Sequence, residues 1–397
     1  MKCLALILSV AGLALSGALA PVYAADNDIV IGFAVAQSGW MSENDGPPLQ
    51  GAELAIKDIN AKGGVLGRQL KPVFADTKSD QTEGAKAGQT VLAQGAKLLV
   101  VSCDYDMGAG AATVGNDAKI PTMSLCASDA KMGVQGIGPY AFTMANTSLS
   151  FGASLAQWAT EVKKLKTAYL LLDTSSEYPK GICAGFKEQW EKNGTVVGED
   201  TFKQDDPSIA SQITRMQQVA AKTPIDFVMI CSYSAGNVSA IKQIRAAGLS
   251  MAIGGGDSMD GDYWTSAIPH LNDHYAITVG STFGDDPRPA INDFMDRMTK
   301  FTGSRPRFAE ALNGYSVIQA MSIATQRAGT TDGDKVLAEL NKFKDEPLLI
   351  GPTTFTPDLH IALTRPLTVL AIRDGKGYFQ DLVKLQDPPP LQLIFKQ

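Results

Sequence analysis

The sequence predicts an α/β protein built from two doubly wound parallel sheets. Short apolar runs alternate with segments of helical periodicity along almost the whole chain. This alternation starts twice, once near residue 29 and again near residue 146. The chain has 397 residues, more than one hydrophobic core usually supports, so two domains are expected.

The first 24 residues predict export from the cytoplasm. Lys2 gives a positive start, residues 4–20 are apolar, and Val22-Tyr23-Ala24 places small residues at positions −3 and −1 of a cleavage site. A membrane anchor is the alternative, but polar residues follow the cleavage site directly. Cys3 lies far upstream of that site, so no lipid-modified cysteine is expected. We therefore expect cleavage after Ala24 and a free periplasmic protein.

The first series of elements begins with residues 29–36, a continuous apolar run typical of a strand buried on both faces. A helix follows at 48–62, with apolar residues on one face and a stop at Gly63-Gly64. Further strands are predicted at 70–75, 98–102 and 121–125, with helices at 81–94 and 109–119. Such a series forms a parallel sheet with right-handed crossovers.

The second series repeats this pattern. Helices are predicted at 146–164, 179–192, 208–221 and 235–247, and strands at 168–172, 196–202, 227–231 and 251–254. A strand at 276–282 and helices at 289–302, 308–327 and 334–343 come next. The chain ends differently, because predicted strands at 367–372 and 378–384 flank Asp374-Gly375, which is typical of a hairpin.

Charge and composition exclude several classes of function. The chain carries 35 Lys and Arg against 41 Asp and Glu, and removal of Lys2 with the export signal changes the net charge from −6 to −7. A nucleic-acid partner would need a basic face, so none is expected. No later apolar run reaches the ~18 residues of a membrane span. Histidines are few and the cysteines are widely spaced, so neither a metal site nor a cofactor is expected.

Polar residues follow the predicted strands at their carboxyl ends, where open parallel sheets bind ligands. These groups are Ser102 to Asp106, Cys126 to Asp129, Asp173 to Tyr178, Ser232 to Ser234, and Gly254 to Ser258. Each has a structural alternative: Ser128 and Ser234 could cap helices, Tyr178 and Tyr233 could be packing residues, and Asp257 could belong to a turn.

Signatures of enzymes are weak in this chain. The segment 256–260 approaches the nucleophile elbow of hydrolases, but Asp260 stands where the second glycine is required. No dinucleotide fingerprint and no P-loop is present in the sequence. We therefore expect no catalytic residue, and a periplasmic hydrolase remains a third hypothesis.

One segment carries a specific resemblance. Residues 51–68, GAELAIKDINAKGGVLGR, preceded by Ser38-Gly39, resemble the first helix and turn of the leucine/isoleucine/valine-binding protein family of periplasmic receptors. Residues 224–228, 241–249 and 350–355 also match, so the resemblance runs over essentially the whole mature chain. It implies two lobes joined by three crossovers, a type I periplasmic binding fold. Lobe one would comprise residues 25–145 and 276–353, and lobe two residues 146–275 and 354–397.

The resemblance also implies a function and a site. An amino acid would be clamped between the lobes and delivered to an ABC-type permease in the inner membrane, by a receptor that is a monomer. Tyr105, Ala127 and Ser128 match positions that hold the ligand carboxylate, Asp257 matches the acidic anchor of the ammonium group, and Tyr178 and Tyr233 match the two aromatic residues that flank the ligand.

The chain departs from the family pattern around the ligand side chain. Acidic neighbours surround Tyr105, Asn44 stands where an aromatic residue is frequent, and Trp40 replaces a usual proline. The side chain that is recognised therefore stays open. A branched-chain or related amino acid is the first hypothesis, and an amide, a urea or an aromatic carboxylate is the second. Asp257 discriminates between them, because it would attract an ammonium group and repel a ligand that carries only a carboxylate.

The four cysteines of the mature chain offer two candidate disulfides. Cys103 and Cys126 follow neighbouring predicted strands at the same sheet edge. Adjacent strands lie ~4.8 Å apart, within the range that a disulfide tolerates. Two buried free thiols are the alternative. Cys183 and Cys231 form a second candidate pair.

Overall fold

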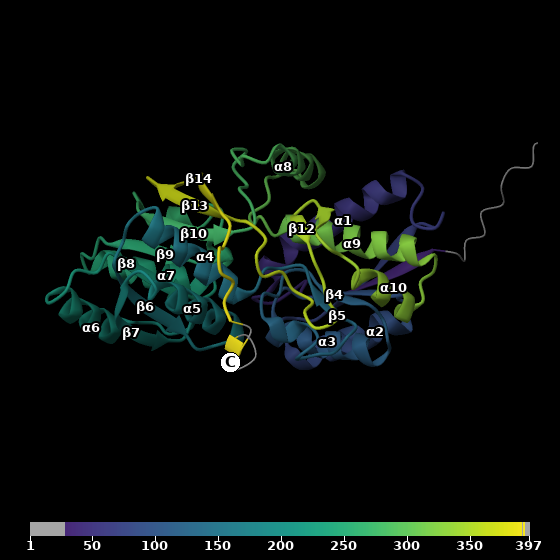
Figure 1. The fold of residues 1–397 in the computed structure, drawn as a ribbon, viewed down its shortest axis with the longest axis horizontal. Helices are drawn as coiled ribbons and strands as arrows, with labels where there is room; N and C mark the ends of the chain where they lie inside the picture. Colours follow the sequence, from purple (N-terminus) through teal and green to yellow (C-terminus); the bar gives the residue numbers. More distant parts are fainter. Residues whose placement is uncertain (1–27, 391, 394–397) are drawn as a thin grey trace, which may run out of the picture.

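Two separate sheets divide the molecule into two lobes that lie side by side (Figure 1). The computed structural model describes residues 28–390 and 392–393. The predicted export signal and its cleavage site lie outside these residues. The element order alternates strands and helices as the sequence predicts.

Lobe one contains a five-stranded sheet in the order β2-β1-β3-β4-β5, and every neighbouring pair is parallel. The strands are β1 (Ile29–Val35), β2 (Leu70–Asp76), β3 (Leu98–Val101), β4 (Thr122–Ser124) and β5 (Ala141–Thr143). The central strands β1 and β3 are almost wholly buried, because helices cover both faces of the sheet.

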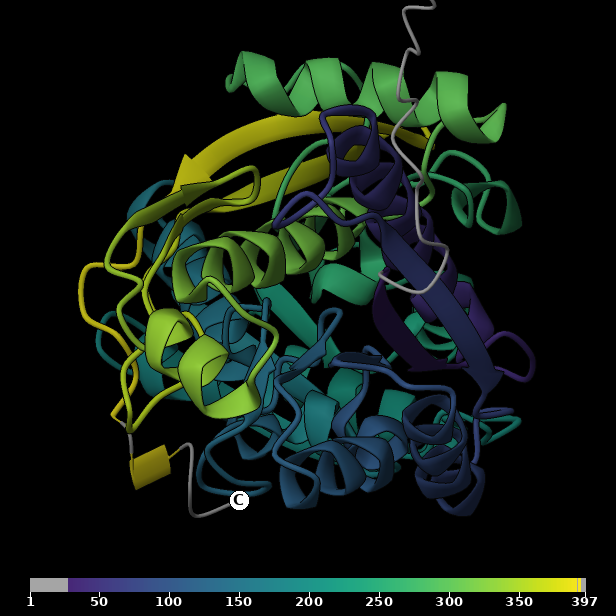
Figure 2. The same cartoon turned by 90° about the vertical axis from the view of Figure 1, so that its right-hand side faces the viewer.

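The helices of lobe one are α1 (Ser42–Ala61), α2 (Gln81–Ala93), α3 (Tyr105–Asp117), α8 (Pro289–Thr302), α9 (Ala311–Ala328) and α10 (Gly333–Leu340). The short hairpin β11 (Glu346–Leu348) and β12 (Gly351–Thr353) follows α10. Helices α2 and α3 pack on one sheet face, and α1 and α9 pack on the other. Figure 2 shows α8 as the outermost helix above this layer.

Lobe two contains a seven-stranded sheet in the order β14-β13-β10-β9-β8-β6-β7. Its strands are β6 (Thr167–Asp173), β7 (Thr195–Phe202), β8 (Phe227–Cys231), β9 (Ala252–Gly255), β10 (His274–Thr278), β13 (Leu367–Arg373) and β14 (Lys376–Val383). The first five are parallel, and the predicted C-terminal hairpin of β13 and β14 adds an antiparallel edge. Helices α4 (Ser148–Glu161) and α5 (Glu177–Trp190) cover one face, and α6 (Ala210–Ala220) and α7 (Ser234–Ala246) cover the other.

Glycines allow two helix pairs to approach each other closely. A Cβ atom on Gly152 of α4 would lie 2.0 Å from the Ile182 carbonyl oxygen of α5, and one on Gly185 would lie 2.0 Å from the Leu149 carbonyl oxygen. In lobe one, a Cβ atom on Gly314 of α9 would lie 1.7 Å from the Pro48 carbonyl oxygen of α1. Any larger side chain at these positions would push the helices apart.

Three chain crossings connect the lobes, and hydrogen bonds tie two of them together. The buried Arg365 guanidinium donates to the Met144 carbonyl oxygen at 2.8 Å and to Thr353 Oγ1 at 3.0 Å. Asn146 Nδ2 donates back to the Arg365 carbonyl oxygen at 2.9 Å. The first and third crossings therefore form one hydrogen-bonded unit at the hinge.

Two lobe boundaries lie at other residues than the sequence predicted. Strand β10 pairs with β9 and β13 of lobe two, so the second crossing follows Thr278 and does not lie at residue 276. The segment between β12 and β13 packs on lobe one, since Phe355 contacts Phe142 and His360 bonds the Ala141 carbonyl oxygen. The third crossing therefore lies just before β13 and not at residue 354.

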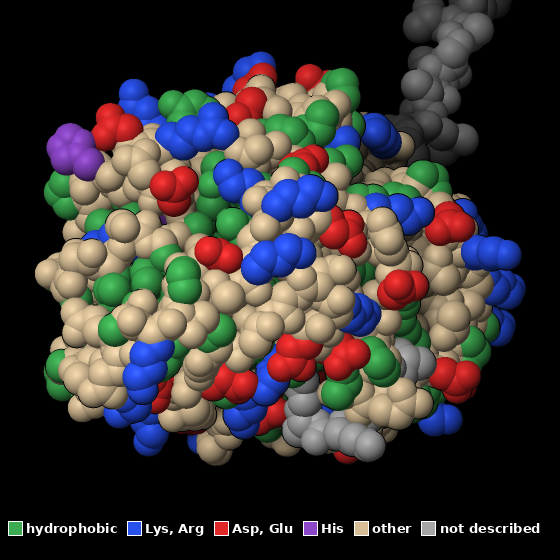
Figure 3. Space-filling view, turned by 60° about the vertical axis from the view of Figure 1, so that its left-hand side comes forward, with side chains coloured by type: hydrophobic (Ala, Val, Ile, Leu, Met, Phe, Trp, Pro, Cys, Tyr) green, Lys and Arg blue, Asp and Glu red, His purple; other side chains and the backbone are tan. Residues whose placement is uncertain are grey.

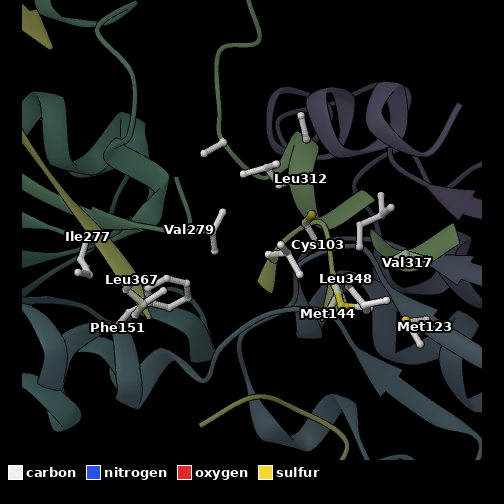
Figure 4. Close-up of a cluster of buried hydrophobic side chains, with 14 of the residues drawn as sticks. Cys103, Met123, Met144, Phe151, Ile277, Val279, Leu312, Val317, Leu348 and Leu367 are labelled. Atoms are coloured by element: carbon white, nitrogen blue, oxygen red, sulfur yellow. The ribbon is translucent and has the colours of Figure 1, made fainter. Parts of the chain in front are cut away.

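A continuous apolar cluster runs through the region between the lobes. Figure 4 shows Phe151, Ile277 and Leu367 on the lobe-two side and Cys103, Leu312 and Val317 on the lobe-one side, with Val279 between them. Val279 follows β10 directly and is buried. The second crossing is thus anchored by apolar contacts as well as by chain continuity.

The outer surface carries charges of both signs. Lysine and arginine side chains are interspersed with aspartate and glutamate over the face shown in Figure 3. Within the described part of the chain, no helix is long and apolar enough to span a membrane. The described residues likewise contain no group of histidine, cysteine and acidic side chains that could hold a metal ion.

Candidate ligand-binding site

A cavity lies between the lobes, at the carboxyl edges of both sheets. Its space, including the mouth, measures about 350 Å³. The lining residues are Met41, Asn44, Cys103, Cys126, Ser128, Tyr178, Tyr233, Asp257, Ser258, Phe308 and Glu310. Two larger hollows, of about 790 and 910 Å³, lie along α5 and β7 and beside the third crossing. The first cavity is the candidate site, because it lies at the carboxyl edges of both sheets and buried polar groups of both lobes line it.

Ser128 is the lobe-one residue that best fits its predicted role. It follows β4, is 4% exposed, and its Oγ has no hydrogen-bond partner among the described residues. Ala127 is placed differently: its N–H donates to Ser124 Oγ, and its carbonyl oxygen accepts from Thr143 Oγ1. Both main-chain groups of Ala127 are therefore occupied, and Cys126 lines the cavity in its place.

Tyr105, also predicted to contact the ligand, lies outside the cavity lining. It is the first residue of α3, and its ring lies 5.4 Å from Lys131 Nζ. The preceding Asp104 caps the helix by accepting from the Met107 N–H. Asp104 also accepts a hydrogen bond from the Tyr233 hydroxyl at 2.5 Å, which joins lobe one to lobe two. Burial raises the pKa of Asp104 to about 7.

Lobe two contributes the predicted acid and both predicted aromatic residues. Tyr178 and Tyr233 stack with ring centroids 4.7 Å apart. The Tyr178 hydroxyl donates to Asp257 Oδ1 at 2.5 Å. Asp257 follows β9 at the start of a short 3₁₀ turn, and burial raises its pKa to about 6. The structure thus brings together Ser128, Tyr178, Tyr233 and Asp257.

Two further acids lie beside Asp257. Asp260 Oδ2 accepts from the Ala309 N–H at 2.7 Å and from Thr278 Oγ1 at 2.8 Å. Glu310, just before α9 in lobe one, lines the cavity and is 6% exposed. Burial, followed by charge repulsion from the neighbouring acids, raises the pKa of Glu310 well above its usual range. Burial likewise raises the pKa of Asp260.

Sequence reasoning missed the residues that enter the cavity from helix starts. Met41 directly precedes α1, and Phe308 and Glu310 precede α9. Asn44, in the first turn of α1, was named from the sequence only as a departure from the family pattern. The rule that ligands lie beyond strand ends cannot find them. The sequence offered one signal for Glu310: it is an acidic residue in an apolar stretch at the start of the helix predicted from residue 308.

Contacts across the mouth hold the two lobes together. Lys131 Nζ of lobe one lies 2.6 Å from Glu177 Oε2 of lobe two, and the Glu177 N–H donates to Asp106 Oδ2. The Trp40 ring meets the Tyr233 ring edge-on at 5.5 Å. These bonds, together with the Tyr233–Asp104 bond, define a closed arrangement of the cleft.

Both candidate disulfides are present. Cys103 and Cys126 are bonded with Cα atoms 4.3 Å apart, and Cys183 and Cys231 with Cα atoms 5.7 Å apart. Strands β3 and β4 are neighbours, as the first pairing required. The first bridge links the turn that carries Asp104 to the turn that carries Ser128. The alternative of free thiols was therefore wrong.

Two α/β lobes that close over a buried polar cavity define a bilobal ligand-binding protein. A sequence profile of the family described as periplasmic binding protein matches residues 28–376. The chain belongs to this family of solute-binding proteins, and both the predicted family and the predicted fold class are confirmed.

Several relatives are similar over most of their length. The Leu/Ile/Val-binding protein homolog 3 of Brucella melitensis is 23% identical over 89% of this chain and 93% of its own. The Leu/Ile/Val-binding protein of Escherichia coli K12 is 22% identical over 83% of this chain and 86% of its own. Among solved structures, LivJ of Streptococcus pneumoniae in complex with isoleucine has a TM-score of 0.80 at 24% identity, and covers 90% of this chain and 99% of its own.

Proposed function

We propose that this protein captures an amino acid between its two lobes and delivers it to an ABC-type permease. It acts in the periplasm as a monomer, after removal of the export signal behind Ala24. The observation that supports this most directly is the pairing of Ser128 and Asp257 in one buried cavity. A free hydroxyl donor suits an α-carboxylate, and a carboxylate suits an α-ammonium group.

The names of the relatives support an aliphatic or related amino acid as the ligand class. The curated relatives are named for leucine, isoleucine and valine, and one solved relative contains isoleucine. Apolar surface from Met41 and Phe308, with the stacked tyrosines, would cover a ligand side chain. A branched-chain or related amino acid is therefore the first ligand to test.

Aromatic carboxylates are the second candidate. A solute-binding protein of Rhodopseudomonas palustris in complex with benzoate has a TM-score of 0.74 to this structure. A ligand of that kind has no ammonium group to meet Asp257, and it would bring its carboxylate beside a buried acid. Amides and ureas carry N–H donors for Asp257 but no carboxylate for Ser128, so they would use only one of the two proposed anchors.

Hydrolysis is not supported by the residues around Ser258. The Ser258 hydroxyl donates to the Ser232 carbonyl oxygen at 3.0 Å. None of the described lining residues is a histidine. His360 lies elsewhere, between the Ala141 carbonyl oxygen and Asn341 Oδ1. Because no described lining residue is a histidine that could activate this serine, we infer binding without catalysis.

Calorimetry on the mature protein tests the amino-acid proposal. We expect binding of a free L-amino acid, and loss of about 2–5 kcal/mol of binding free energy in Asp257→Asn, because a buried ammonium group would lose its charged partner. The exposed Asp262→Asn variant is the matched control and should leave the affinity unchanged. Tight binding of a deaminated acid, with no binding of any amino acid, would refute the proposal.

A further inference from the structure

The cavity between the lobes is acidic, and none of its described lining residues is basic. Asp257 and Glu310 line it directly, and Asp45, Asp104 and Asp260 are buried close behind the lining. Arg307 lies only three residues before Glu310, but its side chain is largely exposed and has Glu43 and the Tyr263 ring as partners. A zwitterion would add no net charge to this cavity. A ligand with net positive charge would compensate it.

Three of these carboxyls have fixed donors and no buried oxygen without a partner, whereas Asp260 has donors only at Oδ2. Asp45 accepts from the N–H groups of Ala36 and Cys103 and from the Ser102 hydroxyl. Asp104 accepts from Tyr233 and Asp257 from Tyr178. The charge on these groups is spread over hydrogen bonds, and they need no further cation to remain buried.

Glu310 is different. Its Oε2 is buried and accepts no hydrogen bond from a described donor, and the same is true of Oδ1 of Asp260. The two carboxyls adjoin across the lobes, so they can bond to each other only while one keeps a proton. A buried carboxylate with no donor costs several kcal/mol. Either that proton or a cation from the ligand must compensate the pair.

The position of Glu310 separates it from the anchor for the α-ammonium group. Asp257 belongs to lobe two and already defines the expected α-ammonium site. Glu310 comes from lobe one, just before α9 and two residues after Phe308, whereas Asp257 and the stacked tyrosines come from lobe two. The cavity, about 350 Å³ with its opening to solvent, is at the small end of the range for ligand-binding cavities, which favours a short side chain.

We propose that Glu310, with Asp260 behind it, forms a second subsite that binds an ammonium group on the ligand side chain. The preferred ligand is then a short amino acid with two ammonium groups. This inference rests on the proposed function, because it uses Asp257 and Ser128 as the anchors of the α-groups. It adds a specificity-determining residue that selects among amino acids.

Two pairs of ligands of equal shape test the inference. In calorimetric titrations, 2,4-diaminobutyrate is compared with norvaline, which has a methyl group in place of the side-chain ammonium. Asparagine is compared with leucine in the same way. We expect 2,4-diaminobutyrate to bind at least tenfold more tightly than norvaline, and this ratio to fall close to one in Glu310→Gln. Asparagine, which offers neutral N–H donors, should show a smaller advantage over leucine.

The ratio of affinities within one variant is independent of how much Glu310→Gln changes the stability of the protein. Glu43→Gln, at an exposed acid near the mouth, is the matched control and should keep the parental ratio. Norvaline and leucine binding at least as tightly as their polar partners would overturn this inference and leave the amino-acid proposal standing. An equal loss of the ratio in Glu43→Gln would also overturn it, because the effect would then be long-range attraction. Failure of these four and of every other amino acid to bind would refute the proposed function itself.

Discussion

Removal of the Cys103–Cys126 bridge should lower both stability and affinity. The bridge closes a loop with a sequence separation of 23 residues, and the entropy of that loop in the unfolded chain corresponds to about 3.4 kcal/mol. For a lobe of about 200 residues this amounts to a fall of roughly 7–14 °C in the unfolding midpoint. Thermal unfolding of the double variant Cys103→Ala/Cys126→Ala, monitored by circular dichroism, measures this fall.

The second bridge provides the matched control. Cys183 and Cys231 are separated by 48 residues, so their double alanine variant should lose about 4.1 kcal/mol. The losses of ligand affinity in the two double variants should rank in the opposite order to their losses of stability. The Cys103–Cys126 bridge ties the turn of Asp104 to the turn of Ser128, whereas the other bridge lies within lobe two and leaves Ser128 in place. We expect the larger loss of stability in the second variant and the larger loss of affinity in the first.

The reasoning would be refuted if the first variant bound ligand like the parent protein. It would also be refuted if one variant showed both the larger loss of stability and the larger loss of affinity. Thiol counting on the denatured, unreduced protein gives an independent check. Four free thiols in protein isolated after export would exclude both bridges.

Three further predictions follow from the hinge, the core and a buried histidine. Saturating ligand should lower the radius of gyration in small-angle scattering, because Ser128 and Asp257 lie on opposite lobes and only closure brings both to the ligand; an unchanged radius would contradict hinge closure. Gly314→Ala should destabilise the protein by at least ~2 kcal/mol in urea unfolding, since its Cβ atom would lie 1.7 Å from the Pro48 carbonyl oxygen. Gly46→Ala, with no atom within 4 Å of the added Cβ, should be neutral. Burial lowers the pKa of His274 to about 3, so its neutral form stabilises the fold fully above pH 6.5 and this contribution is lost as the pH falls toward 3. Between pH 7.5 and pH 5, His274→Leu should therefore lose about 2 kcal/mol less stability than the parent, and equal losses would contradict the assigned pKa.

Most of the fold was predictable because each parallel strand is buried on both faces and each helix has one apolar face. Strand β8 and helix α8 have the predicted bounds. The start of α1 was placed too late, at Pro48, because proline is typical of a first helical turn. In the structure Pro47 and Pro48 lie inside the helix, which begins at Ser42. Strand β5 was missed because three residues are too few to show a period.

The candidate site was predictable only where strand ends supply it. Ser128, Tyr178, Tyr233 and Asp257 all follow strands, and the structure gathers them in one cavity. Tyr105 does not line this cavity, because it is the first residue of α3 and the preceding Asp104 takes the position at the strand end. Glu310 depends on the path of the chain after the second crossing, which brings the start of α9 to the edge of the other lobe's sheet. Periodicity along the sequence carries no information about that path.

The hydrogen bonds within the cavity indicate where ligand discrimination arises. The Tyr178 hydroxyl bonds Asp257, so a ligand ammonium group must replace a hydrogen bond that the protein already makes. The net gain at Asp257 is therefore the difference between a charged and a neutral donor. Ser128 Oγ has no described partner to give up, so a ligand carboxylate gains the full interaction there. At Glu310 a ligand cation instead replaces the proton that Glu310 shares with Asp260. Affinity for the α-carboxylate and selection of the side chain should thus depend on these two lobe-one residues more than on the tyrosines. The tyrosines instead bias the closed state, because the Tyr233–Asp104 bond forms only when the lobes meet.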